Sequence, residues 1–459
     1  MKDPRFSTHN LQQTNTELFL AQDPHLKRLN QQIFIHHSSL LNELPIDKPG
    51  IYMVGGGRQV GKTTVLKQWM ARLISTGVEG TLIQFFTGEL IDDHHMLLNH
   101  LQAFLTSVQN DKIKYIIVDE VTYIKDWTKA IKYAADAGLM ESTVLILTGS
   151  DLGFLREGLI LLPGRRGRAE KVDFHLHPLS FRDFVLLKQK TDFDCFDCND
   201  PRTQKLLDLE FENYLKHGGF LTAINDLAKF NRVENSTFRI YSDWIRGDVI
   251  KRNKSEGYLR EVLSAILKYT GSQVSWNSLS KSLSIDHPQT VAEYVELLSR
   301  MDCLFVQSAL LEDKLTAAPK KAKKIAILDP FIHHSIYYYL KSGLSSDQAN
   351  HFYESQIVPQ LLDSEKTSSL VESVVVSHYR RLAPTYYIKA EGEVDLAVVT
   401  HGKFKPIEVK WMNQLRTKDL KQILKYKNSL ILSKSAAMKV EGVTVEHLPS
   451  HLFNLELGS

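Results

Sequence analysis

The stretch Gly-Gly-Gly-Arg-Gln-Val-Gly-Lys-Thr-Thr at residues 55–64 determines the interpretation of this chain. From Gly56 to Thr63 it satisfies the pattern G-x-x-x-x-G-K-[S/T]. The strand-like run IYMV (51–54) precedes it, and the helical stretch TTVLKQWMARLI (63–74) follows. Glycines let backbone N–H groups surround phosphate oxygens, and a helix N-terminus favours negative charge. This context predicts a nucleotide-binding loop rather than the alternative, a glycine-rich turn without a chemical role.

The loop supplies most of the predicted nucleotide site. We expect Lys62 to reach the β- and γ-phosphates and the Thr63 hydroxyl to bind Mg²⁺. ATP and Mg²⁺ are therefore the predicted cofactors. The residues expected to contact the nucleotide are Gly56, Gly57, Arg58, Gln59, Val60, Gly61, Lys62, Thr63 and Thr64.

Two later strand-like runs end in residues that would complete this site. IIVDE (116–120) ends in Asp119, placed to hold Mg²⁺, and Glu120, placed to activate the attacking water. Solvated acids at the end of a buried strand are the alternative. Thr148 ends the run VLILTG (144–149), where its hydroxyl would contact the γ-phosphate or the water.

The stretch LPGRRGR (162–168) follows these strands. An arginine here would stabilise transition-state charge, in a neighbouring subunit of a homo-oligomer. We take Arg165 as the candidate, and the sequence does not distinguish it from Arg166 and Arg168. A solvated basic loop is an equally good interpretation of any one of them.

Five short apolar runs alternate with helical stretches up to residue 178. They are IYMV (51–54), TLIQFF (81–86), YIIVDE (115–120), VLILTG (144–149) and KVDFHLHP (171–178). Strands that alternate with helices predict an α/β fold with a parallel sheet covered on both faces.

The remaining patterns predict further domains. We expect a helical N-terminal segment over 1–45, with KRLNQQIFIHHSSLLNEL (27–44) as its most periodic part. The α/β core spans 46–190 and a helical lid 191–257. Three helix-like segments followed by two strand-like runs predict a winged helix over 258–330. A connector covers 331–367, and a separate α/β domain covers 368–459.

Composition limits the class of protein. The chain has 459 residues, 43% hydrophobic and 24% charged, and a net charge of +3. No apolar run is long enough to span a membrane, and the N-terminus lacks a secretory signal, so we expect a cytoplasmic protein. There are three cysteines. The spacing of Cys195 and Cys198 is half of a zinc site, but no matching second pair exists, so two loop cysteines are the favoured interpretation.

The last 90 or so residues carry a second set of charged side chains. EVDLAVV (393–399) and FKPIEVKW (404–411) are expected to pair as a hairpin through the turn at 400–403. Glu408 and Lys410 would share a face, which Asp395 can join. Such a group can bind Mg²⁺ and activate water against a phosphodiester. Glu372, on the helical stretch SSLVESVVVSHYRRL, is a further candidate ligand. A hairpin with a solvated charged face is the alternative.

Several of these motifs occur together, and in this order the chain resembles a family of bacterial and archaeal AAA+-type P-loop ATPases. The motifs are GGGRQVGKTT, IIVDEVTYIKDW, LTGSD, LPGRRGR and LHPLSFRDF, and the similarity continues through YLKHGGF, QTVAEYVELL and KKIAILDP. The family implies an AAA+ core with a catalytic glutamate, a winged helix and a C-terminal nuclease-like domain. Gly57 and Leu221 depart from the family pattern, which favours proline at both positions.

The tail itself resembles the PD-(D/E)xK nuclease superfamily, with Glu372, Asp395, Glu408 and Lys410 at the motif positions. The order Gln422-Ile-Leu-Lys-Tyr426 on an expected helix fits as well. The resemblance implies a restriction-endonuclease-like fold, which in such proteins either cleaves DNA or only binds it.

These observations predict an ATP-hydrolysing motor or remodeller that acts on DNA, branched or single-stranded. The expected recognition helix, PQTVAEYVELLSR, weighs against groove insertion because it carries Glu293 and Glu296. The basic run PKKAKK (319–324) would touch phosphates or be solvated. The alternative function is a nucleotide-dependent switch that signals through a protein partner.

Overall fold

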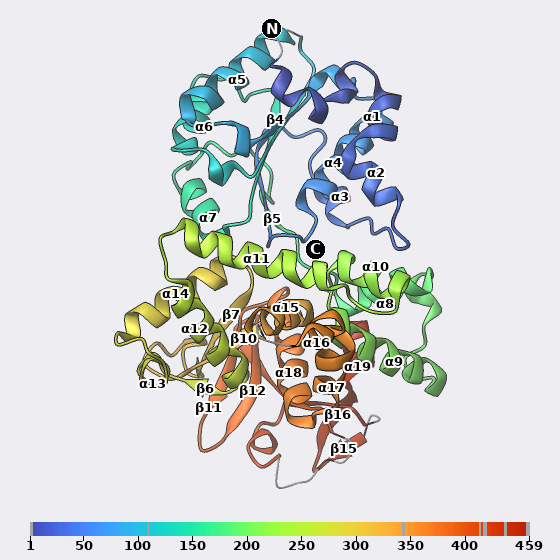
Figure 1. Ribbon diagram of the computed structural model, residues 1–459, viewed down its shortest axis with the longest axis vertical. Coiled ribbons are helices and arrows are strands. Elements are labelled where there is room, and N and C mark those ends of the chain that lie inside the picture. The colour runs from blue at the N-terminus through green and yellow to red at the C-terminus, as the bar shows by residue number, and fades with distance from the viewer. Residues whose placement is uncertain are drawn as a thin grey trace. The chain divides into compact units, whose positions relative to one another are not determined.

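The computed structural model describes residues 3–108, 110–341, 345–412, 415, 420–435 and 438–455. The chain divides into two compact units, whose elements are labelled in Figure 1. The first unit contains the chain up to His177 together with the short segment Arg300–Asp302. The second contains Pro178–Ser299 and the chain from Cys303 onward.

A five-stranded parallel sheet forms the centre of the first unit. Its strands are β1 (Gly50–Gly55), β2 (Ile83–Thr87), β3 (Lys114–Asp119), β4 (Thr143–Gly149) and β5 (Asp173–His175), in the order β2-β3-β4-β1-β5. All neighbouring strands run parallel. The predicted parallel α/β fold is confirmed, and each strand-like run of the sequence overlaps one of these strands.

Both faces of this sheet are covered by helices, and the apolar side chains on each face are buried. Ile51 and Met53 of β1 pack on the side of α5 (His94–Ser107) and α6 (Trp127–Asp136). Tyr52 and Val54 pack on the side of α4 (Lys62–Ser75). Alternate residues of a strand point to opposite faces, so a strand covered by helices on both sides is apolar throughout. The helix α7 (Leu152–Ile160) follows β4.

The N-terminal segment is a chain of short helices rather than one long one. After two 3₁₀ turns come α1 (Thr16–Gln22), α2 (Pro24–Asn30) and α3 (Leu40–Glu43). The expected helical segment over 1–45 is interrupted in its most periodic part, because residues 31–39 are not helical. Leu26, Leu40 and Leu41 are buried, whereas Ile33 between them is 50% exposed. The apolar residues therefore anchor separate turns to the core instead of forming one buried stripe.

The second unit begins with four helices, α8 (Phe181–Gln189), α9 (Pro201–His217), α10 (Leu221–Phe230) and α11 (Asn235–Lys251). The stretch from 211 to 230 was expected to be helical, but Gly218 and Gly219 divide it. Asp329 accepts hydrogen bonds from the backbone N–H groups of Gly219 and Phe331, each at 2.8 Å. A β-carbon at Gly218 would lie 1.8 Å from Oδ1 of Asp329, so only glycine fits. Leu221 stands at the first position of α10, where a proline is well tolerated.

Next come α12 (Glu256–Tyr269), α13 (Trp276–Lys281) and α14 (Pro288–Arg300), as expected. With them is a three-stranded antiparallel sheet of β6 (Gln273–Val274), β10 (Lys323–Ile327) and β7 (Leu304–Ser308), in that order. The expected pairing of the last two strand-like runs is confirmed. Two short strands, β8 (Leu310–Leu311) and β9 (Thr316–Ala317), pair within the connection.

Four helical segments follow: α15 (Pro330–Leu340), α16 (Ser346–Asn350), a π-helical turn (Tyr353–Ile357) and α17 (Val358–Leu362). The long helix α18 (Ser364–Arg380) leads into a six-stranded mixed sheet with the order β11-β12-β13-β14-β16-β15. Its strands are β11 (Thr385–Lys389), β12 (Glu393–Thr400), β13 (Lys403–Lys410), β14 (Leu430–Ser433), β15 (Met438–Val440) and β16 (Val443–His447), and α19 (Leu448–Asn454) comes last.

The expected hairpin of this sheet is confirmed, because β12 and β13 pair antiparallel. His401 and Gly402 both have positive φ at the turn, as a two-residue hairpin requires. The expected helix through Gln422 and Tyr426 is a 3₁₀ turn over Ile423–Lys425. Gln422 accepts from the N–H of Gly392, and Tyr426 donates to Glu312. In the described part of the chain, no helix is both long and apolar enough to cross a bilayer.

Candidate functional site

The nucleotide-binding loop connects β1 to α4. Its backbone needs glycine at Gly56, where a β-carbon would lie 2.5 Å from the carbonyl oxygen of Leu176, and at Gly61, where φ is 102°. Gln59 also has positive φ and is exposed. Lys62 begins α4 and is buried, and its Nζ donates to the carbonyl oxygens of Gly56 and Gly57 at 2.9 and 3.0 Å. The loop thus wraps around its own lysine.

Other loop residues support its shape. The guanidinium of Arg58 lies 5.5 Å from the ring centroid of Tyr123 and donates to its hydroxyl. Val60 is partly buried against the core on the α4 side of the sheet. Thr64 follows Thr63 in the first turn of α4, half-buried.

Asp119 at the end of β3 lies between two hydroxyl groups. Thr63 donates to its Oδ2 at 2.6 Å, and Thr148, at the end of β4, donates to its Oδ1. Burial, and then the nearby charge of Glu120, raise the pKa of Asp119. The parallel strands thus bring the residues expected to hold Mg²⁺, Thr63 and Asp119, into direct contact.

Glu120 lies next to this group in a left-handed conformation, with φ of 53°. Its Oε1 is 3.5 Å from Nζ of Lys62. Its Oε2 accepts from the backbone N–H of Ser150 at 3.2 Å and from the Ser150 hydroxyl at 3.1 Å. Ser150 was not among the predicted site residues, although it follows Thr148 by two positions. The turn at Glu120 also requires glycine at position 88, because a β-carbon there would lie 2.3 Å from the carbonyl oxygen of Glu120.

The residues present fit a nucleotide with Mg²⁺. Oxygen ligands for a hard cation meet at Thr63 and Asp119. Lys62 lies beside them, with its Nζ 3.5 Å from the carboxylate of Glu120. A β-carbon at Gly61 would meet nothing within 4 Å, so the start of α4 is open. The site can bind phosphate at a helix N-terminus and orient a carboxylate close by.

The three candidate arginines differ in their surroundings. Arg165 forms an ion pair with Asp136 of α6 and is 28% exposed. Arg166 is tied to the edge of the sheet, where it bonds Asp173 and the carbonyl oxygen of Val172. Arg168 is exposed. Arg166 therefore holds the loop to β5, whereas Arg165 and Arg168 lie at the surface of the first unit.

The second predicted group lies on β12, β13 and α18 of the second unit. Glu408 is buried, and its Oε1 lies 2.6 Å from Nζ of Lys410. Oε2 of Glu408 is buried with no hydrogen-bond partner among the described residues. Asp395 directly precedes Leu396, which pairs with Ile407 of β13. Its Oδ2 accepts a hydrogen bond from the N–H of Val409 at 2.9 Å. The predicted convergence of Asp395, Glu408 and Lys410 on one face is present.

A lysine that was not predicted joins this group. Nζ of Lys324, on β10, lies 2.8 Å from Oε1 of Glu372 and 3.5 Å from Oδ1 of Asp395, and it also pairs with Glu393. Lys324 belongs to the run PKKAKK, but its side chain is only 1% exposed. The expectation that this run contacts phosphates or solvent was therefore wrong for its last residue.

The acids of this second group have unusual proton affinities. Burial, and then repulsion from Asp395, raise the pKa of Glu372 to about 7 and that of Glu408 to about 8. Burial by itself would lower the pKa of Lys410, but Asp395 and Glu408 outweigh burial and raise it. At neutral pH, Glu372 and Glu408 are therefore partly protonated, which reduces the excess negative charge of this group.

Comparison with known proteins finds a match for the part of the chain that holds the first site. Residues 48–185 match the family model described as AAA domain. This segment, which contains the nucleotide-binding loop and the five-stranded sheet, is similar to AAA domains. Residues 208–348 match a model described as a domain of unknown function, DUF8612. None of the curated proteins matches the sequence.

Solved structures similar to the chain include a Walker-type ATPase of Pyrococcus abyssi, at 15% identity over 65% of this chain and 94% of that one, with a TM-score of 0.44. The ORC1 protein of Aeropyrum pernix in complex with DNA is 12% identical over 73% of this chain and 92% of that one, with a TM-score of 0.33. A RuvB variant of Thermotoga maritima is 17% identical over 56% of this chain and 81% of that one, with a TM-score of 0.24. With TM-scores below 0.5, these neighbours do not define the architecture of this chain.

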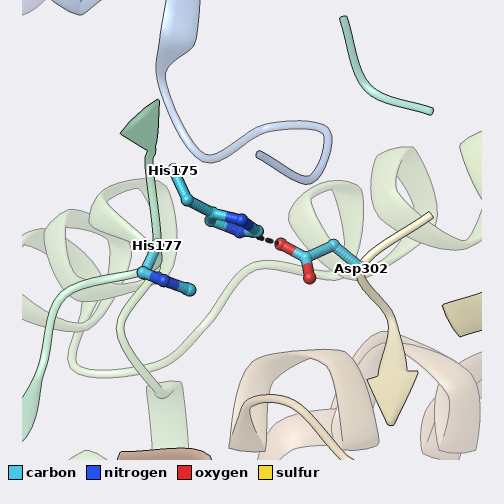
Figure 2. Close-up of side chains that lie close together, drawn as sticks. All are labelled: His175, His177 and Asp302. Atoms are coloured by element: carbon cyan, nitrogen blue, oxygen red, sulfur yellow. Dashed lines mark hydrogen bonds and ion pairs between the residues drawn. The ribbon is translucent and has the colours of Figure 1, made fainter. Parts of the chain in front are cut away.

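Beside the loop of the AAA domain lie His175, His177 and Asp302, all of the first unit. Figure 2 shows His175 pointing towards Asp302, with a distance of 2.8 Å between Nε2 and Oδ2. The two imidazole rings stack with centroids 3.9 Å apart. One ligand atom from each residue lies within 4.8 Å of the others, and this donor set suits a metal such as Zn²⁺. Oδ2 of Asp302 already accepts from the N–H of Gly57 at 3.3 Å, so the group also links β5 to the loop.

This link explains one departure from the family pattern. A proline at position 57 would have no N–H to donate to Asp302. The two cysteines whose spacing is half of a zinc site are different, since Cys195 is exposed and Cys198 bonds Asn454. Neither cysteine belongs to a group of three potential ligands within the described residues.

Proposed function

We propose that this chain is a Mg²⁺-dependent ATPase that acts on DNA as a motor or remodeller and works as a homo-oligomer. The observation that carries the proposal is the meeting of Lys62, Thr63, Asp119, Glu120 and Thr148 at one end of the parallel sheet. These residue types supply phosphate binding, metal binding and a base for water.

The roles follow from the contacts. Lys62 would leave the carbonyl oxygens of the loop to bind the β- and γ-phosphates. Thr63 and Asp119 would hold Mg²⁺, which neutralises charge on the phosphates when it is bound. Glu120, oriented by Ser150, would take a proton from the attacking water. Thr148 holds both Asp119 and, through its hydroxyl oxygen, the backbone N–H of Glu120 at 2.9 Å.

Two features of the second unit support DNA as the partner. The arrangement of α12–α14 with the sheet β6-β10-β7 fits a winged helix. Glu372, Asp395, Glu408 and Lys410 occupy the positions that the PD-(D/E)xK resemblance assigns to metal ligands and the catalytic lysine. We propose that this nuclease-like domain binds DNA, and that any cleavage would need Mg²⁺ at these carboxylates.

The deciding experiment is the steady-state ATPase rate with duplex, single-stranded and branched DNA. We expect stimulation by at least one of them, loss of turnover in Lys62→Ala, and nucleotide binding without turnover in Glu120→Gln. A nuclease assay in Mg²⁺ and in Mn²⁺ runs beside it, with Asp395→Ala as the control. If no DNA changes the rate and Asp395→Ala changes no DNA-related activity, the DNA proposal is wrong.

One observation favours a second candidate, a nucleotide-dependent switch that signals through a protein partner. The only basic residue of α14 is Arg300, which pairs with Asp151 and Glu157, and Glu293 of the same helix pairs with Lys254. A recognition helix that reads the major groove needs basic or neutral side chains there. Very slow turnover with stably bound nucleotide would support the switch, and fast turnover would exclude it.

A further inference from the structure

We propose that Lys324 is a built-in cation that closes the acidic group of Glu372, Glu393, Asp395 and Glu408, so that the resting chain holds no divalent metal there. This inference deepens the proposed function, because it concerns the nuclease-like domain on which that function partly rests. It implies that the domain in its resting state binds DNA without cutting it.

The first argument is occupancy. An ammonium group has one positive charge and three hydrogen-bond donors. Lys324 directs its ammonium at three carboxylates, those of Glu372, Glu393 and Asp395. Glu372 and Asp395 are two of the ligands that a divalent metal would require, so metal and ammonium compete for the same oxygens.

The second argument is that the backbone delivers this lysine to its position. Strand β10 is paired with both β6 and β7. Two residues before Lys324, the carbonyl oxygen of Ala322 accepts from the hydroxyl of Tyr387 at 2.6 Å. Nζ of Lys321 donates to the carbonyl oxygen of Lys389 at 3.0 Å. Both partners lie on β11, so the segment that leads into β10 is attached to the sheet that carries Glu393, Asp395 and Glu408.

The third argument concerns charge. Among the described residues, four carboxyl groups face two ammonium groups, those of Lys324 and Lys410. The buried, unpaired Oε2 of Glu408 shows where this balance is incomplete.

Removal of the lysine should convert the group into a metal site. Carboxylate oxygens are the preferred ligands of Mg²⁺ and Mn²⁺. Bound Mn²⁺ is counted in the full chain without nucleotide, from the electron paramagnetic resonance signal of the free ion. We expect wild type and Asp395→Asn to bind equal amounts. Lys324→Met should bind one more Mn²⁺ ion per chain than wild type, with a Kd at least about tenfold lower than that of any Mn²⁺ binding to these residues in wild type. The added substitution Asp395→Asn should abolish this extra binding.

The matched control is Lys323→Met, one position away on the same strand. Nζ of Lys323 donates to the carbonyl oxygen of Pro319 and makes no ion pair with the acids, so its substitution should leave the Mn²⁺ count unchanged. The proposal is overturned if Asp395→Asn binds one ion fewer than wild type, or if folded Lys324→Met gains none. Circular dichroism establishes folding, and if Lys324→Met does not fold, the comparison of wild type with Asp395→Asn decides.

A second measurement uses wild type alone. Lysines are methylated with formaldehyde and borane, and the labelling of Lys324 and Lys323 is compared by mass spectrometry with and without 10 mM Mg²⁺, a concentration of the order used to saturate weak sites. We expect Lys324 to stay protected in both conditions. Mg²⁺-dependent labelling of Lys324 would mean that metal displaces it and would overturn the proposal. Neither readout depends on DNA, so the absence of DNA-stimulated turnover would count against the proposed function only.

Discussion

Glu120 depends on Ser150 for its orientation, and this dependence can be measured. Ser150→Ala removes the hydroxyl that donates to Oε2 of Glu120 and leaves the backbone N–H in place. A base held by fewer hydrogen bonds spends less time oriented towards water. We expect kcat for ATP to fall by about tenfold with KM changed by less than about twofold. Steady-state ATPase kinetics measure both.

The control for this variant lies at the other end of the same strand. The hydroxyl of Ser142, just before β4, is 3.4 Å from Nζ of Lys114. Ser142→Ala should leave kcat unchanged. An unchanged or raised kcat in Ser150→Ala would show that Ser150 does not orient Glu120 for catalysis.

Glu408 should make stability depend on pH in an unusual direction. Its folded-state pKa of about 8 lies above the ordinary value near 4.3 in an unfolded chain. Between these values the folded state binds a proton that the unfolded state has lost, so stability falls as pH rises towards 8. Glu408→Gln cannot titrate, and over pH 5–9 wild type should lose on the order of 2–4 kcal/mol relative to it.

Urea unfolding at each pH provides the measurement. The exposed Glu365 on α18 supplies the control, because Glu365→Gln should follow the wild-type curve throughout. Parallel curves for wild type and Glu408→Gln would refute the assignment of a raised pKa to this carboxyl group.

At the residue scale, local motifs were enough to bring some side chains together at one site and not others. Lys62, Thr63, Asp119 and Glu120 could be placed because a loop, a helix start and a strand end each have local signatures. Lys324 could not, because a lysine in a basic run has no local signal that distinguishes burial from exposure. Its partners lie on segments far along the chain, so only the tertiary fold pairs them.

At the scale of elements, Asn10 protects the edge strand of the AAA sheet. Its Nδ2 donates to the carbonyl oxygen of Phe85 at 2.8 Å, and its Oδ1 accepts from the N–H of Phe85 at 2.7 Å. Phe85 belongs to β2, which is the outer strand. Asn10→Ala would remove the partner of the Phe85 N–H and leave the Phe85 carbonyl oxygen with only the side-chain amide of Gln84 at 3.2 Å among the described residues, and we expect a loss of about 1–3 kcal/mol.

The midpoint and slope of urea unfolding measure this loss. Gln32→Ala is the control, because among the described residues the exposed side chain of Gln32 bonds the carbonyl oxygen of Arg28 at 3.3 Å and no other group. A loss below about 0.5 kcal/mol in Asn10→Ala, as is usual for surface substitutions, would contradict the role of Asn10 as an edge cover.

The strands of the AAA sheet were predictable because each is a short apolar run between helical stretches. The short helices of the N-terminal segment were not predictable. The apolar residues of 27–44 recur with a helical period, but they contact the core from separate turns and not from one helix face. Asp23 begins α2 by accepting from the N–H groups of His25 and Leu26, and it also pairs with the buried Lys67 at 3.2 Å. Such anchors depend on tertiary contacts that periodicity does not report.

At the scale of the whole molecule, assembly can be tested by mixing two inactive variants. Arg165→Ala retains an intact loop, and Lys62→Ala retains Arg165. If Arg165 acts on the nucleotide of a neighbouring subunit, mixed assemblies contain some complete sites. We expect the ATPase rate of the mixture to exceed the sum of the separate rates. Arg166→Ala mixed in the same way should show no such gain, because Arg166 is tied to Asp173 of its own sheet.

Asp302 has a consequence for synthesis on the ribosome. It belongs to the first unit and accepts from the N–H of Gly57, yet it is translated well after His177, where the rest of that unit ends. At typical elongation rates the delay is on the order of ten seconds. During that interval the N–H of Gly57 in the nucleotide-binding loop lacks its hydrogen-bond acceptor, Asp302. We therefore expect the nascent chain to bind ATP fully only after much of the second unit has been synthesised.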